Sequence, residues 1–267
     1  MPFDTPHQHR PLRRKTLFLS DLHLGALGAR PDLILSFIQQ NPAQTYVLVG
    51  DVLDLWQPIL PHWTAADQAV IDHLNRRADA GARLVYVTGN HDPHPHHAPK
   101  HTRLAADYCE RFLHRAGNGA RFLVLHGDQV DTRWVRSHLV TRLGSLIDHQ
   151  LRRLDNTLRA LRGATRNEAR SAIEALLSTI NALSYAHARH ERSLIKMARD
   201  AGADGVICGH FHLAELHNNH GLIYANCGDW VDSFTALVED TDGCFRLMGG
   251  RAMAGETPTV GVVRGLA

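Results

Sequence analysis

Three features of the sequence predict an α/β fold. Short apolar runs recur along the first 210 residues, and each ends in Gly, Asp, Asn or His. Continuous runs of this kind are typical of strands buried on both faces. Stretches that can form helices lie between them, which is the alternation of layered α/β proteins. After residue 220 three further runs follow one another without a helix, which indicates antiparallel or mixed pairing in that part of the chain.

The expected elements follow in order along the chain. The apolar runs predict strands over 16–19, 46–49, 84–87, 122–125, 205–208, 222–225, 234–238 and 244–248. The stretches between the earlier runs predict helices near 31–40, 65–80 and 101–116. From about Gly249 the sequence is Gly-rich and has no hydrophobic period, so we expect residues 249–267 to form a poorly ordered tail.

Residues 132–200 have a different pattern. Seven aliphatic side chains recur every three or four positions, the spacing of an amphipathic helix: Leu139, Leu143, Ile147, Leu151, Leu154, Leu158 and Leu161. Gly163 can end this helix, and the capping box Thr165-x-x-Glu168 can begin a second one. We therefore expect a helical hairpin, inserted into a single domain that spans residues 1–248.

The expected insertion is strongly basic. It holds thirteen Lys and Arg against six Asp and Glu, a net charge of +7, and because the whole chain carries +2 the remainder carries −5. A basic cap could contact phosphates or the surface of an anionic membrane, although a solvated helix face has a similar composition. The arginines have no base-stacking aromatic residues between them, so we expect no nucleic-acid partner.

The composition excludes several classes of protein. With 267 residues, 44% hydrophobic and 21% charged, the chain resembles a soluble globular protein rather than a collagen-like, disordered or disulfide-rich one. The start lacks a secretory signal pattern, and no window approaches the roughly 18 continuous apolar residues of a membrane span. The four cysteines form no C-x-x-C pair. We therefore expect free thiols in a cytoplasmic protein that meets the inner membrane, if at all, at its surface.

Twenty histidines are unusual in this composition, and several of them follow predicted strands. Five motifs each come directly after such a strand: Asp21-Leu22-His23, Gly50-Asp51-Val52-Leu53-Asp54, Gly89-Asn90-His91-Asp92, His126-Gly127-Asp128 and Gly209-His210-Phe211-His212. The carboxyl ends of strands converge on one edge of an α/β sheet. That edge would gather carboxylates, an amide oxygen and imidazoles, a donor set that suits Mn, Fe, Co or Zn. Seven such ligands are too many for one ion and suit two ions that share a carboxylate.

In this order, the five motifs resemble those of the calcineurin-like metallophosphoesterase superfamily. A closer resemblance, to the UDP-2,3-diacylglucosamine diphosphatase-like group, rests on residues 20–25, on Asp54-Leu55-Trp56 and on the helical insertion before the last motif. The resemblance implies a four-layer sandwich of two mixed β-sheets flanked by helices, with a two-metal site.

The resemblance also implies roles for individual residues. Seven ligands would hold two divalent ions, with Mn expected and Fe, Co or Zn as alternatives. For one ion they are Asp21, His23, Asp51 and His212, and for the other Asp51 as a bridge, Asn90, His126 and His210. His91 would protonate the leaving oxygen or stabilise the transition state, and Asp54 would accept its other N–H and fix the tautomer. Paired ions activate water for attack on phosphorus in line with the leaving group.

Other polar residues allow more than one interpretation. The pattern G-D-x-x-D occurs three times, and only order along the chain and the resemblance select the copy at 50–54. We expect turn, capping or supporting roles for five further aspartates: Asp92, Asp128, Asp131, Asp229 and Asp232. Trp230 could stack on a base or pack in the core. We interpret the remaining histidines of interest as solvated loop or helix-surface residues: His94, His96, His97, His101, His187 and His190.

The resemblance implies hydrolysis of a phosphoester or pyrophosphate link. The expected substrate is UDP-2,3-diacylglucosamine, or a similar nucleotide-linked lipid of lipid A biosynthesis. In that group an Arg follows the Asn of the third motif, whereas this chain has His91, the residue of the wider superfamily. A broader phosphodiesterase or phosphatase, acting on nucleotides, phosphoproteins or other phosphoesters, is therefore the alternative. A third hypothesis, a scaffold without chemistry, predicts missing ligands, and all seven are present.

Overall fold

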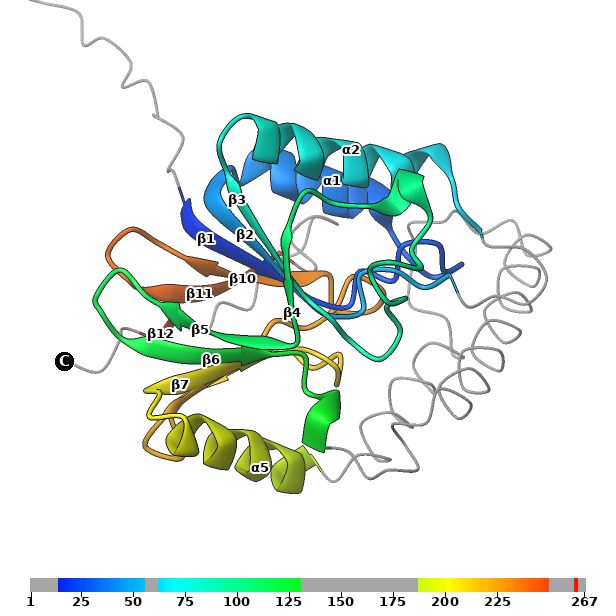
Figure 1. Cartoon of the computed structure of the whole chain (residues 1–267). Coiled ribbons are helices and arrows are strands. Elements are labelled where there is room, and N and C mark those ends of the chain that lie inside the picture. The colour runs from blue at the N-terminus through cyan, green and yellow to red at the C-terminus, as the bar shows by residue number, and fades with distance from the viewer. Residues whose placement is uncertain (1–13, 56–61, 131–186, 250–261, 264–267) are drawn as a thin grey trace, which may run out of the picture.

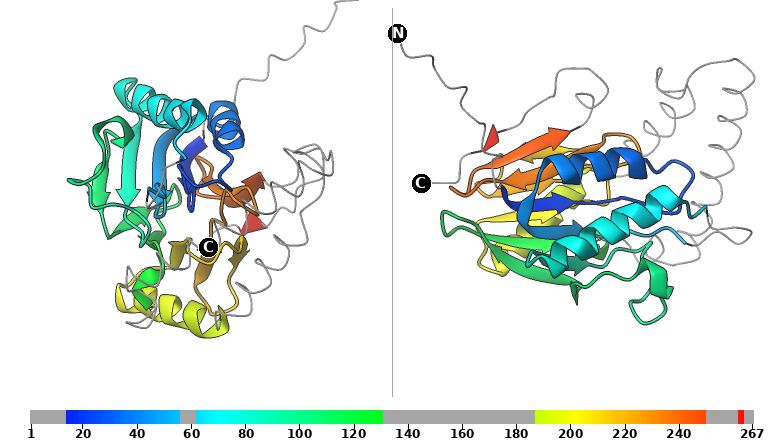
Figure 2. Two further views of the ribbon diagram at one scale, coloured as in Figure 1. Left: turned by 90° about the vertical axis from the view of Figure 1, so that its right-hand side faces the viewer. Right: turned by 90° about the horizontal axis from the view of Figure 1, so that it is seen from above.

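Two β-sheets stack face to face, and helices cover their outer faces (Figure 1). Helices α1 (Pro31–Gln40) and α2 (Ala65–Asp79) lie on the first sheet, and α5 (His187–Asp200) lies on the second (Figure 2). This arrangement confirms the expected four-layer sandwich of mixed sheets. The computed structural model describes residues 14–55, 62–130, 187–249 and 262–263.

The first sheet contains seven strands within the described residues, in the order β12-β11-β10-β1-β2-β3-β4. Four neighbouring strands are parallel: β1 (Arg14–Leu19), β2 (Ala43–Val49), β3 (Arg83–Val87) and β4 (Asp107–Cys109). The other three pair antiparallel: β10 (Thr235–Glu239), β11 (Phe245–Gly249) and β12 (Val262–Val263). The carboxyl ends of β1, β2 and β3 therefore meet at one edge.

The second sheet has the order β5-β6-β7-β9-β8. Three central strands are parallel: β6 (Arg121–Leu125), β7 (Gly205–Cys208) and β9 (Ile223–Asn226). The two edge strands pair antiparallel: β5 (Arg111–Arg115) and β8 (Glu215–His217). As expected, the sheets are mixed, and β6 and β7 also end at a common edge.

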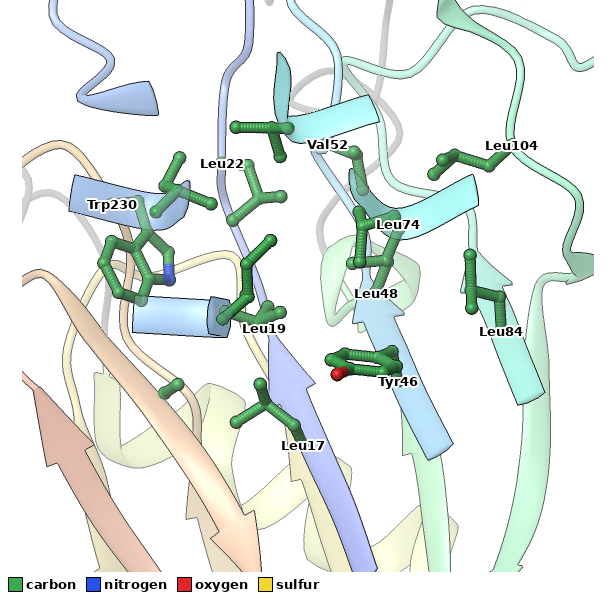
Figure 3. Close-up of a cluster of buried hydrophobic side chains, with 14 of the residues drawn as sticks. Leu17, Leu19, Leu22, Tyr46, Leu48, Val52, Leu74, Leu84, Leu104 and Trp230 are labelled. Carbon is green, nitrogen blue, oxygen red and sulfur yellow. The ribbon is translucent and has the colours of Figure 1, made fainter. Parts of the chain in front are cut away.

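Three apolar layers hold the sandwich together. The layer between the sheets contains Phe18 and Phe122, and the layer between the second sheet and α5 contains Leu194 and Tyr224. The layer beneath α1 and α2 includes Trp230, which is fully buried among leucines (Figure 3). Trp230 therefore packs in the core and does not stack on a ligand.

The start of α2 is tied to the loop that follows β1. Thr64 and Asp67 form a reciprocal capping box, in which Asp67 Oδ2 accepts the Thr64 N–H at 2.8 Å. Asp67 Oδ1 accepts the N–H of Gly25 at 3.2 Å. One carboxylate thus caps the helix and anchors the loop that carries the first motif.

The prediction of a helix near 101–116 is wrong. This segment contains a single 3₁₀ turn, η1 (Lys100–Thr102), followed by β4 and β5. Residues 116–120 form the connection to β6, and Gly119 in that connection has a φ of 88°. An Asn-Gly pair is a strong hairpin signal. Here Asn118-Gly119 outweighs the helix-compatible residues that precede it.

Two other expectations meet the structure only in part. Of the expected insertion, residues 131–186 lie outside the described residues, and residues 187–200 form α5, which packs on the second sheet through Leu194 and Ile195. Within the expected tail, β12 pairs with β11, with Phe245 opposite Val263. The expectation of a poorly ordered tail is therefore wrong at residues 262–263, which form a strand of the first sheet. The four cysteines are free, as expected, and three of them are buried.

Candidate metal centre

The five motifs meet where the parallel strands of both sheets end. Asp21, Asp51 and Asn90 follow β1, β2 and β3, and His126 and His210 follow β6 and β7. Hydrogen bonds join the two sheets at this edge, because His126 Nδ1 lies 2.9 Å from the carbonyl oxygen of Val49 and the His210 N–H donates to Asp21 Oδ2 at 2.9 Å. The first sheet supplies the carboxylates and the second supplies most of the imidazoles.

The backbone at the centre adopts an uncommon conformation. Five non-glycine residues here have φ between 45° and 72°: Asp21, His23, Asp51, His210 and His212. Left-handed φ values are unusual for such residues and concentrate at functional sites. The conformation is held by cross-strand hydrogen bonds, from the Asp21 N–H to the Gly50 oxygen and from the His23 N–H to the Asp51 oxygen, both 3.0 Å long.

Glycines let the motifs approach one another closely. A Cβ at Gly209 would lie 2.5 Å from Asp21 Oδ2 and would overlap the hydroxyl of Ser20. A Cβ at Gly89 would lie 2.5 Å from the backbone nitrogen of Asp51. Gly209 and Gly89 therefore cannot be replaced without a shift, because atoms of the neighbouring motifs occupy the space that a Cβ would need.

One group of candidate ligands surrounds Asp21. Its Oδ1 atom lies 3.8 Å from His23 Nε2 and 3.4 Å from His212 Nε2. All three residues offer ligand atoms within 4.8 Å of one another. The structure therefore brings together three of the four residues predicted for the first ion.

A second group surrounds Asp51, which is predicted to serve both ions. Asp51, His126 and His210 offer ligand atoms within 4.8 Å of one another, and Asp51 Oδ2 lies 3.2 Å from His126 Nε2. The positive charges that lower the pKa of Asp51 belong to His126, His91 and His23 and oppose the effect of burial. The N–H of His23, a member of the first group, donates to the Asp51 backbone oxygen at 3.0 Å, so Asp51 adjoins both groups, as a bridging ligand would have to.

Several buried ligand atoms have no hydrogen-bond partner among the described residues: Asp21 Oδ1, His23 Nε2, Asn90 Oδ1 and His126 Nε2. Leaving such atoms unpaired inside a protein is costly. The contact between His126 Nδ1 and the Val49 oxygen places the ring proton on Nδ1, which leaves a lone pair on Nε2. Oxygen and imidazole atoms oriented in this way fit divalent transition ions.

Asp54 contacts two histidines. Its Oδ2 atom lies 3.5 Å from Nδ1 of His91 and 3.5 Å from Nδ1 of His23. The sequence predicted only the contact with His91. A carboxylate at Nδ1 holds the ring proton there and leaves Nε2 of each ring directed to the centre. Asp54 therefore orients a candidate ligand and the candidate acid together.

The carboxylates of the centre attract positive charge. Burial lowers the pKa of His91, but Asp51 and Asp54 outweigh burial and raise it to about 9. The pKa of His212 rises to about 10, because Asp229 and Asp21 outweigh burial. Burial raises the pKa of Asp21, but the hydrogen bond and charge of His212 lower it to about 2. The electrostatics therefore suit a site that holds cations.

Two further aspartates support the loops, as expected. Asp92 Oδ1 accepts the N–H groups of Val52 and Leu53 at 2.9 and 3.0 Å, and its Oδ2 accepts the N–H of Asp51 at 2.8 Å. Asp229 Oδ1 accepts the N–H of Val231 at 2.8 Å and lies 3.8 Å from His212 Nδ1. Asp128 begins the turn η2 (Asp128–Val130), whereas Asp131 lies outside the described residues.

His190 contacts the centre from α5, so the expectation that it lies on the helix surface is wrong. The side chain is buried, its Nε2 lies 2.9 Å from the Gly127 oxygen, and its ring packs on Phe211 with centroids 3.8 Å apart. Gly127 follows His126, and Phe211 lies between His210 and His212. The spacing in the helix suggested a surface position, so no sequence signal identified this contact.

Comparisons with known proteins identify the family to which the chain belongs. The sequence profile of the calcineurin-like phosphoesterase family matches residues 14–214, so the chain belongs to that family and is a metal-dependent phosphoester hydrolase. The UDP-2,3-diacylglucosamine hydrolase of Neisseria meningitidis serogroup B is 24% identical and covers 85% of this chain and 94% of its own. The enzyme of that name from Nitrosococcus oceani is 25% identical and covers 85% and 92%.

Solved structures with some likeness include Vps29 from Cryptosporidium parvum, at 14% identity and a TM-score of 0.48, covering 93% of this chain and 95% of its own. Another is YfcE, a phosphoesterase from E. coli, at 16% identity and a TM-score of 0.44, covering 88% and 92%. Within the described part of the chain, no helix has the length and apolar character needed to cross a bilayer.

Proposed function

We propose that the protein is a dinuclear metallophosphoesterase whose two ions share Asp51. Asp21, His23 and His212 complete one site, and the other consists of Asn90, His126 and His210. Mn²⁺ is the expected ion, with Fe, Co or Zn as alternatives. The observation that carries the proposal is the set of four buried ligand atoms that lack hydrogen bonds at the meeting point of the two sheets.

Paired divalent ions held by these residues would lower the pKa of a bound water and offset charge on the phosphoryl oxygens. The residues of the chain supply the remaining chemistry. His91 Nε2 lies 4.0 Å from Asp51 Oδ2, at the edge of the group of candidate ligands. A protonated imidazole here can donate to the leaving oxygen, while Asp54 holds the other ring nitrogen.

We further propose UDP-2,3-diacylglucosamine, or a similar nucleotide-linked lipid, as the substrate. The names of the relatives support this substrate class, because the similarity to them extends over most of the chain. An enzyme with such a substrate would act in the cytoplasm at the surface of the inner membrane, in lipid A synthesis. The basic residues of 131–186 could contact that surface, although they lie outside the described residues.

The test is a substrate panel run on protein of known metal content. We expect Mn²⁺-loaded protein to release UMP from UDP-2,3-diacylglucosamine much faster than it hydrolyses aryl phosphates. Metal-free protein and the His91→Ala variant serve as controls. Full metal occupancy without release of UMP would contradict the lipid substrate but not the class of enzyme.

One observation favours a broader phosphoesterase as a second candidate. His91 stands where the UDP-2,3-diacylglucosamine diphosphatases proper carry Arg, and its ring is 17% exposed at the centre. An imidazole that donates to the leaving oxygen does not require a nucleotide-linked lipid. Comparable turnover of bis-aryl and mono-aryl phosphates, without preference for the lipid nucleotide, would favour this candidate.

A further inference from the structure

A second cluster of ligand-type side chains joins α5 to the edge of the second sheet, and the phosphoesterase mechanism does not use it. Glu191 lies in α5, Glu215 and His217 lie in β8, and His220 lies in the loop that follows. We propose that these four side chains bind one Zn²⁺ ion as a structural site.

Ligand atoms of Glu191, Glu215 and His217 lie within 4.8 Å of one another, and His220 Nε2 adjoins this group through Glu191. Glu191 Oε1 lies 3.4 Å from His217 Nε2 and 2.7 Å from His220 Nε2, and Glu215 Oε2 lies 3.9 Å from His217 Nε2. Tetrahedral zinc with bonds of about 2.0–2.1 Å places neighbouring ligand atoms about 3.3 Å apart. The observed distances of 3.4 and 3.9 Å are longer than that value, and the distance of 2.7 Å is shorter.

The central carboxylate, that of Glu191, is buried, and its Oε1 atom lacks a hydrogen bond. Glu191 is 8% exposed, and its Oε1 atom accepts no hydrogen bond of good geometry from any described residue, although two imidazoles lie close to it. Among the described residues, the ion pairs of Glu191 are with His217 and His220 only. A buried carboxylate without a fixed positive partner is costly, and a divalent cation would offset that cost.

The surroundings hold both histidines in position. The His217 ring stacks on buried Tyr224, with centroids 5.2 Å apart and an interplanar angle of 24°. Arg199 donates to the carbonyl oxygen of His220 at 3.5 Å, which holds that loop against α5. Zinc bound to His217 Nε2 would place the ring proton on Nδ1. The His217 Nδ1 atom would then no longer accept the long hydrogen bond of 3.4 Å from the Asn219 N–H.

Four protein ligands leave no open position, which is the pattern of structural rather than catalytic zinc. The ion would fasten α5 to β8, the edge strand of the second sheet. The residue before Glu191 is His190, which holds the Gly127 loop of the catalytic centre. Zinc at this cluster would thus stabilise the helix that supports that centre without entering the reaction.

The test counts zinc in the full-length chain. Protein stripped with a chelator is titrated with Zn²⁺ against a chromophoric competitor, and the bound metal is measured by elemental analysis. We expect the wild type and the control variant His97→Ala, which changes an exposed loop histidine, to bind one equivalent more than His217→Ala/His220→Ala. The shape-conserving variant Glu191→Gln should lose the same equivalent and part of the rise in Tm that zinc produces.

Equal zinc counts in the wild type and in folded Glu191→Gln would overturn the proposal and leave a cluster of hydrogen-bonding side chains without metal. Glu191→Gln decides the matter even where the double variant fails to fold, because Gln keeps the shape of the side chain. Repeating the count in an Asp51→Asn background separates this site from the catalytic centre. The result therefore does not depend on the proposed function.

Discussion

At the scale of single residues, function depends on how Nε2 of each histidine is left available. Asp54 contacts Nδ1 of His23 and His91, and the Val49 oxygen contacts Nδ1 of His126. Each contact fixes a ring proton on the side away from the centre. The Nε2 atoms of His23 and His126 lie 3.8 Å from Asp21 Oδ1 and 3.2 Å from Asp51 Oδ2, so the same arrangement favours cations.

Replacing His91 tests its role as the proton donor. His91→Ala should lower turnover by about 10²–10⁴-fold, the usual contribution of a positioned acid. Metal content should not change, because His91 is not among the proposed ligands. Turnover by steady-state kinetics and metal by elemental analysis check both expectations, with His97→Ala as the matched control. Unchanged turnover would refute the assignment.

His190 provides a test of a positioning residue. His190→Leu removes the hydrogen bond to the Gly127 oxygen and should weaken metal affinity at the centre by about 10–100-fold, as loss of an outer hydrogen bond does. His190→Gln keeps a donor and should restore most of that affinity. Competition titration with Mn²⁺ measures the effect. Equal losses in both variants would indicate a packing role only.

The meeting of the candidate ligands at one edge could be predicted from sequence, because each lies in a short motif after a strand. The positions of Asp21, His126 and His210 could be predicted from their own motifs together with the rule that strand ends converge at one edge of a sheet. His190 could not be predicted in this way, because its partner Gly127 is 63 positions away and its helix spacing indicates a surface position. The second contact of Asp54, with His23, likewise depends on side-chain geometry that no motif encodes.

At the scale of elements, the strand-end loops must lie unusually close to one another. Gly209, which follows β7, faces Ser20 and Asp21, which follow β1. The elements themselves were predictable where continuous apolar runs mark buried strands. The exception is β5, where exposed and buried residues alternate and the strand forms a hairpin with β6 that pairs Arg115 with Arg121.

Adding a methyl group at Gly209 tests this close approach. Gly209→Ala would place Cβ 2.5 Å from Asp21 Oδ2, so we expect a lower Tm together with loss of bound metal. Gly221→Ala is the control: its φ is 72°, but its Cβ would meet no atom within 4 Å. The control should lose about 1–2 kcal/mol from backbone strain and keep its metal. Normal metal content in Gly209→Ala would show that the two loops can move apart without loss of metal binding, which would contradict this prediction.

At the scale of the whole molecule, the two sheets are also joined by an ionic network. Glu239 of β10 is fully buried; its Oε2 lies 2.8 Å from His114 Nε2 of β5, and its Oε1 lies 2.9 Å from Lys15 Nζ. The Gly117 N–H donates to Oε1 at 2.7 Å. Burial raises the pKa of Glu239, but these partners outweigh burial and lower it below its ordinary value of 4.5.

This network makes stability depend on pH. A carboxyl whose folded pKa is lowered stabilises the fold above its unfolded pKa, and that contribution is lost as the pH falls through the folded pKa. Glu239→Gln should therefore lower the free energy of unfolding at pH 7 by about 1–3 kcal/mol. The difference from the wild type should shrink as the pH falls below 4.5. Urea unfolding at several pH values tests this, and a difference that does not vary with pH would contradict it.

The four layers followed from the resemblance of the motifs, because apolar periodicity alone does not say which strands share a sheet. The structure supplies that information: β1 lies between β10 and β2, although β10 lies more than 200 positions later in the chain. The stacking of the two sheets then places His210 beside Asp21 and His126 beside Asp51.

The sharing of Asp51 by two ions is tested most directly by the electron paramagnetic resonance spectrum of the protein with two equivalents of Mn²⁺. A carboxylate bridge between ions about 3.5–4 Å apart predicts an exchange-coupled spectrum in the wild type. Asp51→Asn should show only isolated Mn²⁺. Isolated Mn²⁺ alone in the wild type, or a coupled spectrum that persists in Asp51→Asn, would contradict a dinuclear centre bridged by Asp51.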